Sequence, residues 1–208
     1  MSEMIRAHAK MSKKEAWQKS IEMLGKVGIS SPEYRVSEYP HELSGGMRQR
    51  VMIAMALSCN PRLLIADEPT TALDVTIQAQ ILQLIGELKE KFNTAVMLMT
   101  HDMGVSAEVS DYVMVMYAGK VVEYDTTANI FHHPMHPYTI GLLNSIPRLN
   151  KEQKRLDTIE GTVPSLTNMP KGCRYCTRCP ECMDICREKD PGLLEVDGRK
   201  VRCWKYAN

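Results

Sequence analysis

Asp67 and Glu68 stand side by side directly after a short apolar run, residues 63–66, and this pairing suits metal-assisted chemistry. The first carboxylate after a buried strand can hold Mg²⁺ through water, and the second can polarise a water molecule for attack. His101 follows a second apolar run, residues 95–99. An acidic pair of this kind is equally typical of a strand that ends in a charged loop, so the interpretation needs support from elsewhere in the sequence.

Ser44, Gly45 and Gly46 form a second group, at the predicted start of a helix that runs to Leu57. A serine hydroxyl, exposed N–H groups and the positive end of a helix suit a phosphate group. Glycine lets the backbone approach such a ligand closely. An ordinary helix N-cap is the alternative, and the run Met-Arg-Gln-Arg at 47–50 makes it the less favoured one.

Phosphoryl transfer requires that the phosphates are held, Mg²⁺ is coordinated, a water is aimed and the developing charge is stabilised. The loop motif that holds phosphates, G-x-x-x-x-G-K-S/T, does not occur in this sequence. The only Gly-Lys pairs, at 25–26 and 119–120, are each followed by Val. We therefore expect that this chain does not hydrolyse a nucleotide by itself.

Alternating helices and buried strands are predicted to position these residues, which indicates an α/β sheet. Residues 63–66 and 95–99 are predicted as buried strands because they are short, apolar and flanked by helix breakers. A helix starts between them, at Asp74 or Thr76. Its apolar stripe consists of Ile77, Ile81, Leu84, Ile85 and Leu88.

Further elements flank this central region. Residues 1–28 show helical spacing, with Ser12 and Glu15 as a capping box. A boundary rich in proline and histidine follows at 131–137. The remaining predictions are a helix at 103–109, a hairpin of 112–117 and 120–124 around Ala118-Gly119, a helix at 138–146 and an irregular segment at 147–171.

Composition indicates a soluble globular chain. The formal net charge is +1, so no electrostatic attraction to nucleic acid or to acidic lipid is expected. No stretch approaches the roughly 18 apolar residues of a membrane-spanning helix. The start of the sequence lacks the apolar core of a secretory signal. The chain is therefore interpreted as cytoplasmic, held at a membrane only through partners.

Six of the seven cysteines lie between 173 and 203. In a cytoplasmic chain such a cluster predicts a metal or iron–sulfur site. The spacing over 176–186 is that of a bacterial ferredoxin run, although Arg187 replaces the usual proline and too few ligands remain for a second cluster. Zinc on four thiolates is the main alternative. The seventh, Cys59, is predicted to be a small buried residue.

The order of the motifs resembles the second half of an ABC-type ATPase: LSGGMRQR at 43–50, DEP at 67–69, TALD at 71–74 and THD at 100–102. Other segments resemble the ATP-binding subunits of dipeptide, oligopeptide or nickel importers. These segments are YPHEL at 39–43, HPYT at 136–139, LLNSIP at 142–147 and the cysteine tail after GTVPSL at 161–166. Members of that family carry a long upstream segment with the phosphate loop and Q-loop, so the chain is interpreted as truncated at its N-terminus.

The resemblance implies a role for each matching residue. Asp67 would be the Walker-B aspartate for Mg²⁺, Glu68 the carboxylate that polarises water, and His101 the switch histidine at the γ-phosphate of ATP. Asp74 would lie in the D-loop that couples two opposed sites. The signature residues that contact the ATP bound by a partner subunit would be Ser44, Gly45, Gly46 and Gln49.

The implied fold is α/β: part of an ABC-ATPase (RecA-like) core with a helical subdomain and a small Cys-rich C-terminal extension. Its expected divisions are the signature subdomain at 1–58, the C-terminal part of the core at 59–130 and the extension at 131–208. The cysteines that match the family tail, which holds a 4Fe–4S cluster in some members, are Cys173, Cys179, Cys186 and Cys203. Zinc is the alternative metal, and Cys176 and Cys182 depart from the family set.

The implied function is that of an ATP-binding and ATP-hydrolysing subunit that powers peptide import at the cytoplasmic face of the cell membrane. Its implied partners are a second ABC ATPase subunit, membrane permease subunits and, indirectly, an extracytoplasmic binding protein. Two alternatives remain. One is an inactive truncated or regulatory fragment, and the other is an iron–sulfur or zinc protein with a vestigial ABC half.

Overall fold

The computed structural model describes residues 1–71, 73–146 and 158–207 of the 208-residue chain. The chain divides into two compact units, Met1–His101 and Asp102–Asn208. We call them the N-terminal and C-terminal units and describe each by itself. The three-part division expected from the sequence, at 1–58, 59–130 and 131–208, differs from this partition and stays a prediction. Part of the irregular segment, residues 147–157, and Pro147 of the LLNSIP motif lie outside the described residues.

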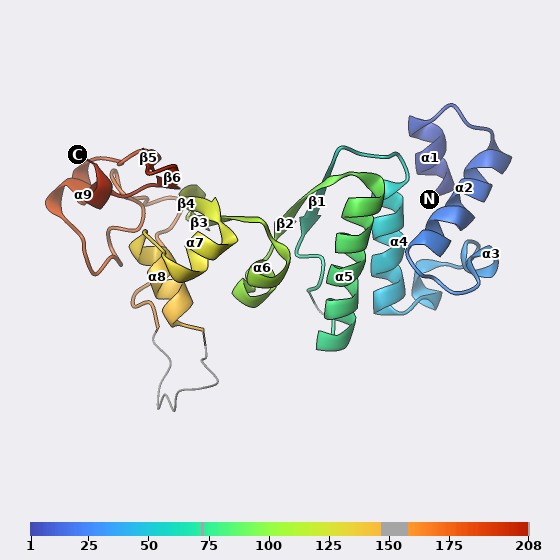
Figure 1. Ribbon diagram of the computed structural model, residues 1–208, viewed down its shortest axis with the longest axis horizontal. Coiled ribbons are helices and arrows are strands. Elements are labelled where there is room, and N and C mark those ends of the chain that lie inside the picture. The colour runs from blue at the N-terminus through green and yellow to red at the C-terminus, as the bar shows by residue number, and fades with distance from the viewer. Residues whose placement is uncertain (72, 147–157, 208) are drawn as a thin grey trace. The chain divides into compact units, whose positions relative to one another are not determined.

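Helices make up most of the N-terminal unit (Figure 1). The capping box predicted at Ser12 and Glu15 is present, with both reciprocal hydrogen bonds. Ser44 is the N-cap of the helix that ends at Leu57, as predicted, and Asp74 is the N-cap of the next long helix. The helices are α1 (Ser2–His8), α2 (Lys13–Lys26), α3 (Pro32–Arg35), the short η1 (Pro40–Glu42), α4 (Gly45–Leu57) and α5 (Val75–Phe92).

The apolar stripe of α5 packs against α2 and α4, and this packing forms the core of the unit. Burial of such a stripe stabilises a helix by about 25 cal/mol for each Å² of apolar surface removed from water. The core residues are Met23, Leu24, Val27, Ile29, Ile53, Ala54, Leu57, Ile81, Leu84, Ile85 and Leu88. Arg50 ties two of these helices together, because its guanidinium donates to the carbonyl of Val27 at the end of α2, at 2.6 Å.

Strands β1 (Leu63–Asp67) and β2 (Ala95–Met99) pair in parallel, with Leu63 opposite Ala95 and Asp67 opposite Met99. Both were predicted as strands, but the prediction that they are buried is wrong for one face. Ile65 is 57% exposed and Met97 is 45% exposed. The alternate residues, such as Leu64 and Val96, contact the helical core. One side of this two-stranded sheet therefore lies open in the described structure.

A four-stranded antiparallel sheet with the order β3-β4-β6-β5 organises the C-terminal unit. The predicted hairpin is confirmed: Ala118 and Gly119 at its turn have φ values of 46° and 78°, as a tight two-residue turn requires. The sheet was not predicted beyond this hairpin. Its strands are β3 (Tyr112–Tyr117), β4 (Lys120–Thr126), β5 (Leu194–Val196) and β6 (Arg199–Val201).

Short helices complete the C-terminal unit: α6 (Met103–Val109), α7 (Thr127–His132), α8 (Pro137–Asn144), α9 (Asp184–Glu188) and the short η2 (Trp204–Tyr206). Its core is aromatic. Tyr117 contacts the rings of Tyr138 and Tyr175 edge-on, with centroids 4.7 and 5.1 Å away. The guanidinium of Arg178 lies over the ring of Tyr117 and donates to the carbonyls of Ile159 and Glu160. This contact anchors the irregular segment to the sheet.

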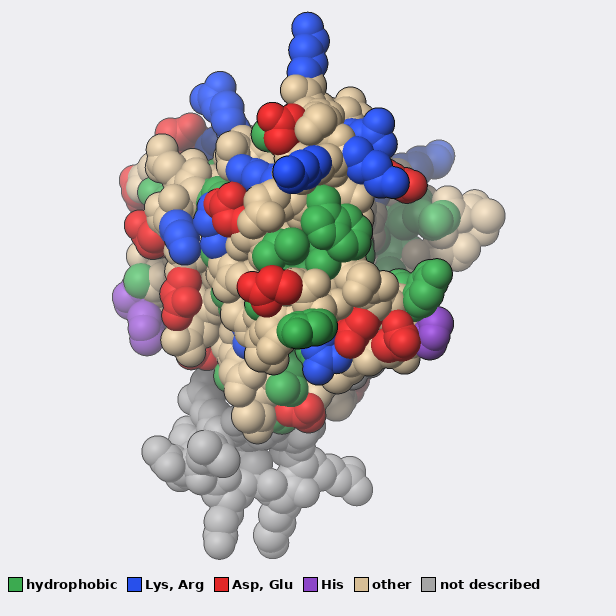
Figure 2. Space-filling view, turned by 90° about the vertical axis from the view of Figure 1, so that its right-hand side faces the viewer, with side chains coloured by type: hydrophobic (Ala, Val, Ile, Leu, Met, Phe, Trp, Pro, Cys, Tyr) green, Lys and Arg blue, Asp and Glu red, His purple; other side chains and the backbone are tan. Residues whose placement is uncertain are grey.

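The outer face of α1 to α3 shows apolar side chains among basic and acidic ones (Figure 2). The exposed large apolar residues within the first 40 positions are Met11, Trp17, Tyr34 and Tyr39. Scattered exposure of this kind is normal on soluble proteins. In the part of the chain that the structure describes, none of the helices combines the length and apolar character needed to cross a membrane.

Candidate functional site

Glu68 and His101 meet at the carboxyl ends of β1 and β2. Because these strands are parallel and in register, the residues that follow them emerge at the same edge of the sheet. The N–H of Glu68 donates to the carbonyl of Met99, 2.9 Å away. Oε1 of Glu68 lies 3.0 Å from Nδ1 of His101. The structure thus brings together two side chains that the sequence separates by one helix, α5, and one strand, β2.

Thr71 completes the arrangement around Glu68. Its hydroxyl donates to the other carboxylate oxygen, Oε2, at 2.8 Å. The hydrogen bonds from Thr71 and then from His101 hold the pKa of Glu68 below its usual range. A carboxylate that stays ionised can accept a proton or a water hydrogen bond. Sequence analysis placed Thr71 only within a motif, although a hydroxyl three residues after a carboxylate is a recognisable signal.

The backbone of Glu68 is unusual. Its φ is 44°, in the left-handed region that non-glycine residues seldom adopt. Such strain costs on the order of 1–3 kcal/mol and collects at functional sites. The Glu68 side chain is 45% exposed and that of His101 is 80% exposed. The pair is therefore open to solvent and to a ligand.

Asp67 is the last residue of β1 and is exposed directly beside Glu68. Its position fits a carboxylate that holds a cation through water. Asp74 has a different setting, because its Oδ1 accepts from the N–H of Ile77 at 2.9 Å as the N-cap of α5. This bond gives Asp74 a structural role, and the D-loop role stays a prediction.

The start of α4 has the features of an anion site. The Ser44 side chain accepts from the N–H of Met47 at 3.3 Å, and Ser44 and Gly45 are exposed. A Cβ on Gly45 would meet Leu73 at an ordinary 3.7 Å, so packing leaves room for a side chain there. Gln49 lies within α4 and is half-buried. The roles of these signature residues stay predictions.

His136 belongs to a buried structural network. Its Nδ1 accepts from the N–H of Tyr138 at 3.0 Å, and burial lowers its pKa to about 4. Glu123, which sequence analysis did not single out, accepts from the N–H groups of Met135 and His136 at 2.7 and 2.9 Å. Glu123 and His136 therefore fix the turn before α8. The prediction that Cys59 is buried is wrong, because Cys59 is exposed just beyond the end of α4.

The six C-terminal cysteines lie in one module around α9. The N–H of Cys173 donates to the carbonyl of Cys186 at 2.8 Å, and a Cβ on the preceding Gly172 would stand 2.3 Å from that carbonyl oxygen. Burial raises the pKa of the Cys179 thiol to about 11. Over the described residues, no group of three or more His, Cys, Asp or Glu side chains is arranged to hold a metal ion. The metal-ligand roles of Cys173, Cys179, Cys186 and Cys203 therefore stay predictions.

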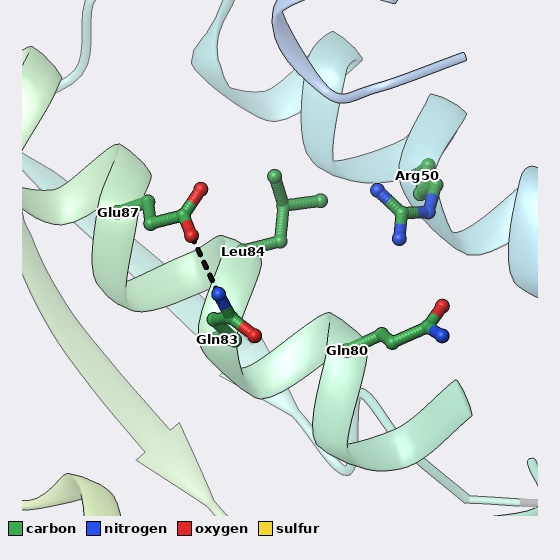
Figure 3. A pocket seen from close by; sticks show the side chains of 5 residues that line it. All are labelled: Arg50, Gln80, Gln83, Leu84 and Glu87. Atoms are coloured by element: carbon green, nitrogen blue, oxygen red, sulfur yellow. Dashed lines mark hydrogen bonds between the residues drawn. The ribbon is translucent and has the colours of Figure 1, made fainter. Parts of the chain in front are cut away.

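A small hollow of about 150 Å³ lies between α4 and α5 (Figure 3). Its lining residues are Arg50, Gln80, Gln83, Leu84 and Glu87, and Gln83 donates to Glu87 at 2.9 Å. None of the predicted site residues lines it. We assign it no chemical role.

Two family models match the chain. Residues 2–71 match the ABC transporter family, and residues 122–186 match the C-terminal region of oligopeptide/dipeptide transporters. The oligopeptide transport ATP-binding protein AppD of Bacillus subtilis is 56% identical over 99% of this chain and 63% of its own length. The chain is homologous to the ATP-binding proteins of oligopeptide and dipeptide transport. The α/β class expected from the sequence is confirmed, and the match of residues 2–71 to the ABC transporter family agrees with the expected ABC-type architecture.

Other ATP-binding proteins of this group show the same extent of similarity. OppD of Escherichia coli is 52% identical over 99% of this chain and 61% of its own length. DppD of Bacillus subtilis is 52% identical over 98% of this chain and 61% of its own length. The chain thus spans less than two thirds of these relatives. Among solved structures, an ATP-binding cassette with ADP and phosphate, MJ0796, is 32% identical, with a TM-score of 0.48 over 56% of this chain and 49% of that one.

Proposed function

We propose that this chain is part of an ATP-hydrolysing subunit that powers the import of peptides across the cytoplasmic membrane. The observation that carries the proposal is the 3.0 Å contact between Glu68 and His101 where two parallel strands end. The names of the relatives, oligopeptide and dipeptide transport ATP-binding proteins, support peptides as the cargo.

ATP with Mg²⁺ would supply the phosphoryl group and the positive charge that phosphoryl transfer requires. Asp67 would hold the cation through water at the edge of the sheet. Glu68, kept ionised by Thr71 and His101, would orient the attacking water and accept its proton. Ser44 and the first N–H groups of α4 would receive a phosphate in a site shared with a second ATPase subunit.

The further partners would be membrane permeases and, through them, an extracytoplasmic binding protein. The chain would work at the cytoplasmic face of the membrane.

A chimera tests this proposal: this chain replaces the matching part of Escherichia coli OppD, and ATP hydrolysis is measured. Glu68→Gln should lower the rate at least about 100-fold, because it removes the carboxylate that orients water, and nucleotide binding should remain. The control is Glu87→Gln on the surface of α5, which should keep the parental rate. A Glu68→Gln rate close to the parental rate would show that the catalytic assignment is wrong.

A finer proposal concerns the cysteine module. We infer a structural 4Fe–4S cluster, or zinc in its place, on Cys173, Cys179, Cys186 and Cys203, which requires the thiols to converge from their described positions. The gathering of six cysteines in one module supports it, and no step of hydrolysis is assigned to it. Iron and zinc analysis of anaerobically prepared protein tests it: Cys203→Ser should remove the metal, whereas Cys176→Ser should keep it.

A further inference from the structure

Tyr39 and His41 form an aromatic pair on the surface of the N-terminal unit, at the short η1 between α3 and α4 (Figure 1). Their rings are nearly parallel, with an angle of 9° between the ring planes and 5.7 Å between the centroids. An offset stack of this kind is a favourable arrangement of two aromatic rings. Tyr39 is 68% exposed, and His41 is exposed as well. The pair therefore presents a flat aromatic surface to solvent.

The backbone of η1 holds the two rings in place. The Glu42 carboxylate accepts from the N–H of Tyr39 at 2.7 Å, and the N–H of Glu42 donates to the carbonyl of Tyr39 at 2.9 Å. Pro40, which separates Tyr39 from His41 in the sequence, has a φ angle fixed by its own ring. A surface that is ordered in advance loses little conformational freedom when a flat ligand stacks on it.

The position of the pair along the chain indicates which flat ligand it takes. Tyr39 and His41 shortly precede Ser44, the N-cap of α4. Five residues of fully extended chain span at most about 18 Å, so both rings lie near the N–H groups that would receive a phosphate. In a nucleoside triphosphate, the ribose and the inner phosphates separate the base from the γ-phosphate. A group that binds the base is therefore expected beside the phosphate site and not within it.

We propose that Tyr39 and His41 form a stacking platform for the adenine of the ATP whose γ-phosphate lies at Ser44, in the site shared with a second ATPase subunit. Aromatic side chains stack on nucleobases through the π-face of the base. His41 covers one face of the Tyr39 ring, so the base contacts the other face. The inference deepens the proposed function and rests on it, because that shared site supplies the nucleotide.

Substrates with and without a base test the stacking. The OppD chimera is assembled with a second ATPase subunit and the permeases, and KM is measured for ATP and for ribose triphosphate, which lacks the base. Tyr39→Ala should raise the KM for ATP roughly tenfold, as expected for the loss of one stacking contact, and should leave the KM for ribose triphosphate unchanged. Tyr39→Phe should keep the parental KM for ATP, because it retains the ring.

Two further variants complete this measurement. His41→Ala should raise the KM for ATP by a smaller factor, because the Tyr39 ring remains but loses its support. The control is Tyr34→Ala, which removes a tyrosine that is 77% exposed and lies outside the pair. It should keep both KM values. Equal changes in the KM for ATP and for ribose triphosphate in Tyr39→Ala would overturn the proposal.

Photolabelling of the assembled chimera gives a second measurement that requires neither hydrolysis nor a variant. The probe is an ATP analogue with a photoreactive azide on its adenine. Trypsin cleaves after Arg35 and Arg48, so one peptide, residues 36–48, contains both rings. Fragmentation of this peptide should place the label on Tyr39 or His41, and excess ATP should prevent it. Label confined to the second ATPase subunit would overturn the proposal.

The two measurements separate failure of this inference from failure of the proposed function. Label on Tyr39 or His41 in a chimera that does not hydrolyse ATP would support the base contact and contradict the proposed function. Parental hydrolysis together with an unchanged KM for ATP in Tyr39→Ala would overturn the base contact alone.

Discussion

The two units of this molecule each join a glutamate to a histidine, and they use the two side chains in opposite ways. In the N-terminal unit, Glu68 and His101 contact each other through side-chain atoms and are 45% and 80% exposed. In the C-terminal unit, Glu123 and His136 are each 1% exposed. There, the Glu123 carboxylate accepts hydrogen bonds from two backbone N–H groups, one of them that of His136.

The contrast separates polar groups that build a fold from those available to a ligand. Burial of a carboxylate is tolerated only where hydrogen bonds replace the lost water, and Glu123 meets this condition with two backbone donors. Glu68 also has two partners, Thr71 and His101, but it remains exposed and its backbone is strained. Exposure combined with strain is the pattern expected of a functional residue.

Among the substitutions predicted here, removal of the Glu123 or Glu68 carboxylate should give the largest difference in free energy of unfolding between the two units. Glu123→Ala should lower the free energy of unfolding by about 3 kcal/mol, because two buried N–H groups lose their acceptor and Arg199 loses one of its two carboxylate partners. Glu68→Ala should leave the denaturation midpoint unchanged. Urea unfolding followed by circular dichroism measures both. Glu195→Ala, on the exposed face of β5, is the control for a glutamate substitution in the same sheet as Glu123.

If Glu68→Ala lowered the midpoint as much as Glu123→Ala, the assignment of Glu68 to function rather than architecture would be wrong.

The buried histidine should make stability depend on pH. Burial lowers the pKa of His136 from 6.5 to about 4, so the unfolded chain binds a proton more tightly than the folded chain. The contribution of His136 to folding stability is therefore fully present above the pKa that this histidine has in the unfolded chain. It is lost as the pH falls toward the pKa that His136 has in the folded chain. The loss should reach about 3 kcal/mol between these two pH values. Unfolding free energies measured across this range test it.

His136→Asn is the matched variant for this measurement, because asparagine can still cap the helix start. It should remove the part of the pH dependence that His136 causes. An unchanged pH profile would mean that other groups produce the effect.

Glycines in the two units should respond differently to the same substitution. At Gly172 a Cβ would meet the backbone oxygen of Cys186 at 2.3 Å, so Gly172→Ala should lower the free energy of unfolding by roughly 1–3 kcal/mol. At Gly45 the nearest atom is 3.7 Å away. Gly45→Ala should therefore leave stability unchanged or raise it slightly. The same urea measurements compare them, and equal losses would contradict a ligand-related reason for glycine at 45.

Local signals explain most of what could be predicted from the sequence. The N-caps Ser44 and Asp74, the capping box at Ser12 and the turn at Ala118-Gly119 each depend on a few consecutive residues, and all are present. The proximity of Glu68 and His101 was also predictable, because each residue follows one of two neighbouring parallel strands and therefore lies at the same edge of the sheet.

Long-range pairing and burial could not be predicted in the same way. Strand β6 pairs with β4, with Val201 opposite Glu123, across more than seventy positions of sequence. Nothing near Glu123 indicates that its partners are the N–H groups at 135 and 136. The exposed face of β1 and β2 was also missed, because a short apolar run predicts a strand without stating which of its faces another layer covers.

The smallest expected effect separates the two roles of Ser44. Its hydroxyl caps α4 by accepting from the N–H of Met47, and loss of such a cap costs about 1 kcal/mol. Ser44→Ala should lower the free energy of unfolding by this amount, whereas Ser44→Asn should keep the cap and the stability. If Ser44 also receives a phosphate, ATP hydrolysis by the OppD chimera should fall in both variants. If the Ser44→Asn chimera hydrolysed ATP at the parental rate, the role of Ser44 would be helix capping alone. Ser44 would then belong, like Glu123, to the residues that stabilise the fold.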